Sequence, residues 1–138
     1  FSLGNFLKQE NIFKVNLNSF EEILNKFSNL SFLQKSDIND IINKASNNNF
    51  YSYLGLKIGI IFHKLNTKNS QDKVLIAINE KEICINGKKI STIILINSNC
   101  EKKYRGIIYN FVKLFLLNNE FSFNNSRLNI YDYLISNI

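Results

Sequence analysis

The chain of 138 residues has no proline, tryptophan or methionine, only five glycines and two cysteines, and a single histidine. It has no Pro-rich or Gly/Ser-rich linker and no internal repeat, so nothing divides it into separate units. We therefore expect one domain over residues 1–138, long enough to bury a substantial core. Because the chain begins at Phe1 without a methionine, we expect it to be part of a longer or processed protein.

The few cysteines argue against metal chemistry. Cys84 and Cys100 are too far apart for a Cys-x-x-Cys motif, and no secretory signal opens the chain. We therefore expect both thiols to be reduced and partly buried in a cytoplasmic protein. One histidine and two scattered cysteines are a poor zinc set, so no metal or other cofactor is predicted. Apolar runs are far shorter than the roughly 20 residues of a membrane-spanning helix, which excludes membrane insertion.

The formal charge of +6 is weak evidence for a partner. Nucleic-acid-binding proteins concentrate their basic residues on one face. Here the lysines are spread along the chain, with small clusters only at Gly87–Lys89 and Glu101–Arg105. The richness in Asn, Ile and Lys is typical of an AT-rich genome. A nucleic-acid-binding domain is therefore the least favoured hypothesis, and its test is a steep salt dependence of binding.

Helical periods occupy both ends of the chain. Ser19 and Glu22 form a capping box before an apolar stripe at i, i+3, i+4 and i+7, which predicts a helix. Ser36 is the expected N-cap of a second helix, followed by a polar loop at residues 46–55. A long helix is predicted from Lys103, and a last helix at residues 126–138 with its apolar positions at 128, 131, 134, 135 and 138.

The middle of the chain changes to β-branched runs. They lie at residues 57–62, 73–79, 81–87 and 91–98. Asn86-Gly87 is a strong hairpin signal. The run Ile93–Ile96 is apolar at every position, which is typical of a central strand covered on both faces. Two helices, several strands and two helices predict an α/β fold, a sheet with helices on both faces.

His63 is the main candidate for chemistry because it follows a buried strand, where ligands gather in α/β sheets. A neutral imidazole can act as a nucleophile, a base or a ligand. Phosphoryl transfer needs one exposed ring nitrogen without a proton, the other nitrogen hydrogen-bonded, and positive charge nearby. Lys64 and the start of the helix near Tyr104 are candidate donors. The competing interpretation is a half-buried histidine that merely ends a strand.

Other classes of site have no support in the sequence. The glycines form no phosphate-binding loop, and there is no Gly-x-Ser-x-Gly motif. The carboxylate pairs Glu21/Glu22 and Glu80/Glu82 are interpreted as solvated faces.

The segments LKQENIFKVNLNSFEEIL, GLKIGIIFH and YRGIIYNFVKLF, in this order and spacing, resemble the type-2 IIA domains of the bacterial sugar phosphotransferase system (fructose, mannitol and nitrogen types). The resemblance implies a mixed sheet flanked by helices. It also implies that His63 accepts a phosphoryl group from the phosphocarrier HPr. The histidine would pass it to a IIB domain, or use it to control a transcriptional regulator that contains the domain.

The chain departs from the family's pattern around the histidine. Phe62 replaces the proline that precedes it, and Tyr104 stands where a second histidine is common. The Arg-Glu pair usual after the second helix either appears as Lys44-Ala45 or is missing. Lys64, Tyr104 and Phe62 are the candidates for the phosphate pocket. These departures leave an alternative open, a degenerate IIA-like binding or regulatory module without phosphotransfer.

Overall fold

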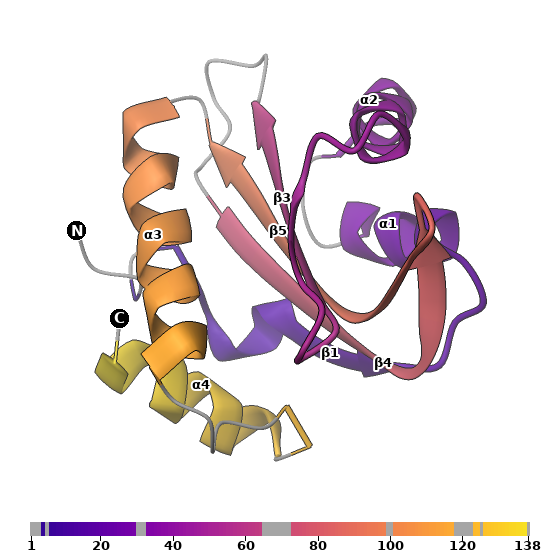
Figure 1. Cartoon of the computed structure of the whole chain (residues 1–138). Helices are drawn as coiled ribbons and strands as arrows, with labels where there is room; N and C mark the ends of the chain where they lie inside the picture. Colours follow the sequence, from indigo (N-terminus) through magenta and orange to yellow (C-terminus); the bar gives the residue numbers. More distant parts are fainter. Residues whose placement is uncertain are drawn as a thin grey trace.

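The computed structural model describes residues 4, 6–29, 33–64, 73–98, 101–117, 123–124 and 126–137, without the side chains of residues 101, 103, 104 and 117. Figure 1 shows a sheet between two pairs of helices, which confirms the predicted α/β fold. The elements, after a short 3₁₀ turn at Gln9–Asn11, are β1 (Ile12–Val15), α1 (Phe20–Ser28), α2 (Lys35–Ser46), β2 (Tyr51–Tyr53), β3 (Ile58–Lys64), β4 (Lys73–Ile85), β5 (Lys88–Ser98), α3 (Glu101–Leu117) and α4 (Arg127–Asn137).

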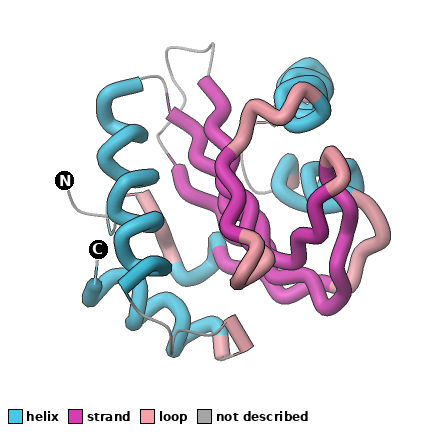
Figure 2. The backbone as a smooth tube through the Cα atoms, in the orientation of Figure 1, coloured by secondary structure: helices cyan, strands magenta, loops and turns pink. Residues whose placement is uncertain are grey.

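The sheet has the strand order β1-β4-β5-β3-β2 and is mixed. Figure 2 shows the strands together in the middle of the molecule, with helices on both sides. The pairs β1–β4 and β3–β5 are parallel, and the pairs β4–β5 and β2–β3 are antiparallel. The β5 strand is central, and all four residues of Ile93–Ile96 are buried, as its unbroken apolar run predicts. A strand covered on both faces needs no polar residue at alternate positions.

Two cores lie on opposite faces of the sheet. On the face covered by α3 and α4, the first core includes Ile58, Ile60 and Phe111. On the face covered by α1 and α2, the second core includes Phe27 and Ile61. Alternate residues of β3 therefore enter different cores, as the two-residue period of a strand requires.

Helix α1 begins as predicted. The hydroxyl of Ser19 accepts a hydrogen bond from the Glu22 N–H at 3.2 Å, and the Glu22 carboxylate accepts one from the Asn18 N–H at 2.7 Å. Helix α2 begins differently from the prediction, because Ser36 lies inside the helix. Its N-cap is Gln34, whose N–H donates to the Asp37 carboxylate at 2.8 Å. Asp37 therefore closes the first turn, a role that a carboxylate three residues into a helix performs well.

Two segments that the sequence did not predict as strands form short strands in the structure. The predicted polar loop contains β2, which pairs with the edge of β3. Ile12–Val15 forms β1 beside β4. The runs 73–79 and 81–87 are one strand rather than two, and a change of register between Ile78 and Ile83 separates its halves. Asn86 and Gly87 make the predicted turn, with φ of 49° and 77°.

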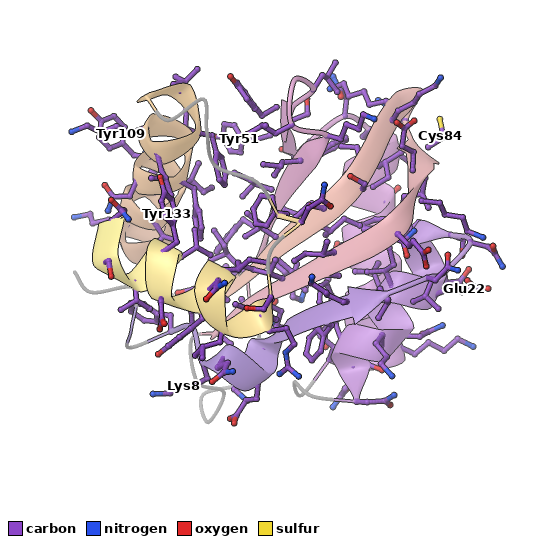
Figure 3. The ribbon with its side chains drawn as sticks, turned by 90° about the horizontal axis from the view of Figure 1, so that it is seen from below. Lys8, Glu22, Tyr51, Cys84, Tyr109 and Tyr133 are labelled. Atoms are coloured by element: carbon purple, nitrogen blue, oxygen red, sulfur yellow. The ribbon has the colours of Figure 1, made fainter. Side chains whose placement is uncertain are left out.

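Other expectations at the surface were wrong in detail. Helix α3 begins at Glu101, two residues before the predicted start. Leu128, expected on the apolar stripe of α4, is half exposed, and Ile130 is buried in its place. Cys84 is exposed rather than partly buried, and it points away from the body of the molecule (Figure 3). Cys100 lies outside the described residues.

Candidate functional site

His63 is the second-last residue of β3, at the predicted strand end. Strand alternation directs its ring to the same face as Ile61, toward α1 and α2, whereas Phe62 packs against the first core. The residue is only 1% exposed. Phosphoryl transfer predicted an exposed ring nitrogen, and the competing interpretation predicted a half-buried ring. The ring is more deeply buried than either expectation.

The ring is held by helix α2. Nε2 of His63 lies 2.9 Å from Oδ1 of Asp37, within hydrogen-bond distance. The other carboxylate oxygen of Asp37 accepts the Gln34 N–H described above. One carboxylate therefore both caps α2 and ties that helix to the end of β3.

A second carboxylate faces the other side of the ring. Oδ2 of Asp40 lies 3.5 Å from Nδ1 of His63, and the same oxygen lies 3.6 Å from Nζ of Lys44. Among the residues that the structure describes, Nδ1 has no hydrogen-bond partner. The Asp40 side chain is 52% exposed and that of Asp37 only 16%. Asp40 is therefore a surface group beside the ring, and Asp37 is part of its packing.

Asn97 is the neighbour of His63 in the parallel pair β3–β5. It is 2% exposed and, by the alternation of Leu95 and Ile96 between the two cores, lies on the same face as the histidine. Its Oδ1 has no hydrogen-bond partner within the described part of the chain. Two buried polar atoms that have no hydrogen-bond partner among the described residues thus belong to paired residues at one end of the sheet, which is uncommon in folded proteins.

The other predicted site residues do not gather around the ring. Lys64 is exposed and follows His63 on β3, so alternation directs it to the opposite face. Phe62 is half buried against the first core. Tyr104 lies in the first turn of α3, on the opposite face of the sheet from α2, and its side chain is outside the described part. Of the family's Arg-Glu position, Lys44 pairs with Asp40 and Ala45 is buried.

Sequence reasoning missed Asp37, Asp40 and Asn97. A signal for the first two was present, because carboxylates at i and i+3 lie on one side of a helix. The choice of Ser36 as N-cap hid it. Asn97 gave no comparable signal, because its pairing with His63 depends on the register of two strands 34 residues apart.

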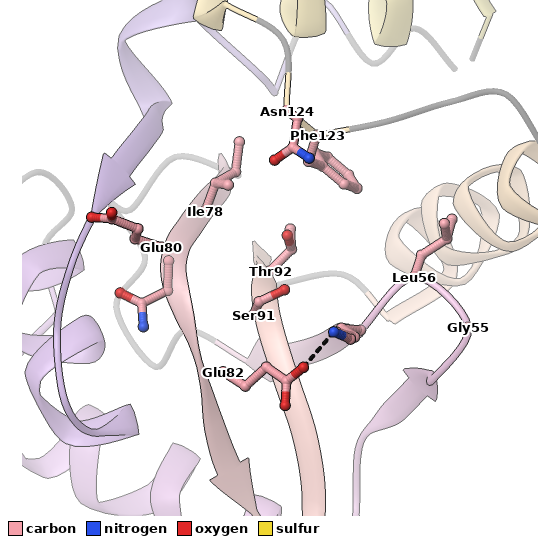
Figure 4. A pocket seen from close by; sticks show the side chains of 11 residues that line it. Gly55, Leu56, Ile78, Glu80, Glu82, Ser91, Thr92, Phe123 and Asn124 are labelled. Atoms are coloured by element: carbon pink, nitrogen blue, oxygen red, sulfur yellow. Dashed lines mark ion pairs between the residues drawn. The ribbon is translucent and has the colours of Figure 1, made fainter.

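A separate cavity of about 390 Å³ lies on the other face of the sheet (Figure 4). Its lining includes Lys57, Glu82, Thr92 and Phe123. Thr92 pairs with Ile58 at the start of β3, five residues before His63, or roughly 16 Å along the strand. This cavity therefore belongs to neither the face nor the sheet end of the histidine.

Two of the charged groups at this second cavity, Lys57 and Glu82, are paired with each other. Figure 4 shows the ion pair between Lys57 and Glu82. The hydrogen bond from Lys57 holds the pKa of the Glu82 carboxyl below its usual value, and the positive charges of Lys57 and Lys89 act in the same direction. The side-chain amide of the neighbouring Asn79 forms hydrogen bonds with the backbone. It accepts one from the Leu17 N–H and donates to the carbonyls of Leu17 and Lys81. The side chains of Lys57, Glu82 and Asn79 therefore all have partners within the protein.

The described residues contain no group of three or more His, Cys, Asp or Glu side chains able to hold a metal ion. Within the same residues, no helix is both long and apolar enough to span a membrane.

No protein-family model matches this chain, and neither does any curated protein sequence. Several solved structures match over nearly their whole length. The nitrogen regulatory protein IIA-Ntr of Neisseria meningitidis has a TM-score of 0.75 at 14% identity, covering 96% of this chain and 98% of that one.

Two further structures extend the likeness. A putative PTS IIA domain of Streptococcus pyogenes has a TM-score of 0.71 at 14% identity, with 94% of this chain and 91% of that chain covered. The mannitol-specific cryptic phosphotransferase enzyme IIA of Escherichia coli has a TM-score of 0.68 at 15% identity and 99% coverage of both chains. At such identities the likeness shows the fold alone. This chain has the IIA-type fold that its sequence resemblance implied.

Proposed function

We propose that this chain is a cytoplasmic IIA-type domain in which His63 takes a phosphoryl group from HPr. It then passes the group to a IIB domain, or uses it to regulate a transcription factor that contains it. One observation carries the proposal. In a IIA-type fold, the only histidine of the chain lies near the end of β3. One of its ring nitrogens is held by a carboxylate, and the other has no hydrogen-bond partner among the described residues. That is the arrangement of an activated imidazole.

The transfer is an exchange of one phosphorus–nitrogen bond for another. The lone pair of a ring nitrogen of His63 attacks the phosphorus of phosphorylated HPr, and the bond from phosphorus to the HPr imidazole breaks. The HPr ring leaves with the electron pair of that bond. The transfer needs no metal, oxidant or further reactant for its atoms and electrons to balance. The protein's task is to hold the ring and accommodate the charge of the phosphoryl oxygens.

In this proposal, the Asp40 side chain moves aside when a phosphoryl group approaches the ring. The Asp40 carboxylate, 3.5 Å from Nδ1, would repel an incoming phosphoryl group. Its side chain is half exposed and already lies 3.6 Å from Lys44, so it can turn toward that cation without entering the core. Rotamer changes of exposed side chains are fast compared with phosphoryl transfer. The buried ring is therefore the resting form in this proposal.

The proposed phosphate pocket keeps Lys64, Tyr104 and Phe62 as further members. Lys64 ends β3 directly after the histidine, and Tyr104 belongs to the first turn of α3. In the proposal, Lys64 and Tyr104 contact the phosphoryl oxygens from beyond the sheet end, and Phe62 sets the direction of the chain before His63. Lys64→Ala and Tyr104→Phe are then expected to slow transfer without reducing stability.

A second function is favoured by the burial of the ring. A histidine that is 1% exposed between two carboxylates resembles a structural tie more than an open nucleophile. The corresponding candidate is a IIA-like module that binds partners without accepting phosphate. In that case HPr binding is unchanged by substitution of His63.

Intact-mass spectrometry after incubation with phosphoenolpyruvate, enzyme I and HPr tests both functions. His63→Gln is the matched variant, because its amide can still donate to Asp37. Urea unfolding of both proteins establishes that the variant is folded. An acid-labile gain of one phosphoryl group in the wild type, absent from His63→Gln, supports the proposal. No gain in either protein, in reactions where HPr itself is phosphorylated, supports the binding module.

A further inference from the structure

The outer face of α3 differs in charge from the exposed faces of α1 and α2. The exposed charges of α1 include Glu21 and Lys26, and those of α2 include Lys35 and Asp40. Charges of both signs are typical of a helix face that contacts only water. In α3, by contrast, the exposed charged side chains that the structure describes are all basic: Lys102, Arg105 and Lys113. A face of one sign is complementary to a partner of the opposite charge.

Two large apolar side chains lie on the same face of α3. Tyr109 is 66% exposed and Leu116 is 57% exposed, whereas neither α1 nor α2 has a large apolar side chain that is exposed. Figure 3 shows Tyr109 on the side of α3 that faces away from the sheet. Leu116 follows Tyr109 by two helical turns, so both side chains project from one side of the helix, with Lys113 between them.

Gly106 leaves a gap in this face. It is exposed, and a Cβ added there would meet no atom within 4 Å. A glycine inside a helix costs stability relative to alanine, but it allows another molecule to approach the helix closely. We call the exposed line along α3 the α3 stripe, about 21 Å long at a rise of roughly 1.5 Å per residue. Its members are Lys102, Arg105, Gly106, Tyr109, Lys113 and Leu116.

We propose that the α3 stripe docks an acidic amphipathic helix of a partner protein. The stripe has the i, i+4 and i+7 spacing by which two helices pack side by side. Tyr109 and Leu116 supply its apolar centre, and Gly106 allows the close approach. The cations of the stripe pair with carboxylates that flank the apolar side of the partner helix. The inference goes beyond phosphoryl transfer and does not depend on it, because the stripe contains none of the residues of the proposed phosphate pocket.

A synthetic helical peptide tests the charge and shape of the partner. The probe has about three heptads, with leucine at the a and d positions and glutamate at e and g, and the control peptide has lysine at e and g. In nitrogen-15 NMR titrations of the whole chain, we expect shifts along α3 with the glutamate peptide alone. Its affinity should fall steeply between about 0.05 and 0.5 M salt. No binding at about 1 mM glutamate peptide, or equal binding of the lysine peptide, would overturn the inference.

Two exposed leucines give matched variants. Leu116 lies in the stripe, and Leu128, which is 50% exposed, lies on α4. Leu116→Glu removes an apolar anchor and adds a charge of the same sign as the peptide, so it should weaken binding at least about tenfold. Leu128→Glu should leave the affinity unchanged, and urea unfolding establishes that both variants are folded. Equal effects of the two substitutions would contradict docking on α3.

Gly106→Ala separates docking from stability. The added methyl group fills the gap in the stripe, so the variant should bind the glutamate peptide at least about threefold more weakly. The same variant should unfold at a higher urea concentration than the wild type, because alanine has the higher helix propensity. Unchanged or tighter binding would exclude the close approach of a partner helix and overturn the inference.

Vesicles of phosphatidylglycerol distinguish a partner helix from an anionic membrane surface, which also attracts basic residues. We expect no co-sedimentation of the chain with these vesicles at physiological salt, because the stripe offers only two apolar side chains to a bilayer. Co-sedimentation that Leu116→Glu abolishes, without binding of the glutamate peptide, would overturn the inference and assign the stripe to a membrane surface.

Discussion

The Nε2 atom of His63 and the Oδ1 atom of Asp37 lie 2.9 Å apart, although 26 positions separate the two residues in the chain. The contact joins the end of β3 to the first turn of α2. It gives a buried ring nitrogen a hydrogen-bond partner. The packing of α2 against the end of β3 therefore depends on the same contact that orients the ring.

A double-mutant cycle measures that dependence. His63→Ala is expected to lower the free energy of unfolding by about 2–3 kcal/mol, because it leaves a cavity and a partly buried carboxylate without its donor. With Asp37→Ala as the second change, the coupling energy should be about 1–2 kcal/mol in urea unfolding. The control cycle pairs His63→Ala with Asp40→Ala. A coupling with Asp40 as large as that with Asp37 would contradict the geometry.

The starts of α1 and α2 give a matched pair of serine substitutions. Ser19→Ala removes the side-chain acceptor of the Glu22 N–H and should cost about 1 kcal/mol of stability. Ser36→Ala, inside α2 and exposed, should be neutral or slightly stabilising, because alanine has the higher helix propensity. Thermal or urea unfolding compares the two. Equal losses would mean that Ser36 acts as a cap after all.

Two glycines are expected to respond to alanine in opposite directions. Gly87 has φ of 77° in the β4–β5 turn, so Gly87→Ala should destabilise by about 1 kcal/mol. Gly106 lies in α3, where an added Cβ meets no atom within 4 Å. Gly106→Ala should therefore stabilise by about 0.5–1 kcal/mol. Unfolding curves of the two variants with the same sign of change would show that backbone conformation does not control these sites.

The ion pair between Lys57 and Glu82 at the second cavity predicts a small loss of folding stability at acidic pH. The hydrogen bond from Lys57 lowers the pKa of Glu82 below its usual 4.5. A carboxyl with a lowered pKa stabilises the fold above about 4.5, and that contribution is lost as the pH falls through the folded-state pKa. Because the Glu82 side chain is exposed, the effect on unfolding is small and screened by salt.

Carbon-13 NMR titration of the Glu82 carboxyl tests this directly. In Lys57→Met the pKa should rise toward 4.5, whereas Lys89→Met should raise it less, because that charge makes no hydrogen bond to Glu82. Addition of salt should raise it in the wild type. A Glu82 pKa that does not respond to Lys57→Met would show that the ion pair is not populated in solution.

Local patterns were enough to predict most of the elements. Ser19 and Glu22 begin α1, Asn86-Gly87 closes the hairpin, and Ile93–Ile96 lies in the central strand. Each of these depends on residues within a few positions of one another. The edge strands β1 and β2 were not predicted, because segments of three or four residues are too short to show a hydrophobic alternation. They form strands by pairing with β4 and β3, respectively.

The sequence by itself determined the α/β fold and the position of its one histidine at the end of a buried strand, because periodicity and turn residues act locally. The tertiary structure alone decided what surrounds that ring. The packing of the helices on the two faces of the sheet decides which face the His63 ring occupies. On that face the ring lies beside Asp37 and Asp40, whereas Lys64 is directed to the opposite face. Contacts between residues far apart in the chain arise only when the sheet and α2 have assembled.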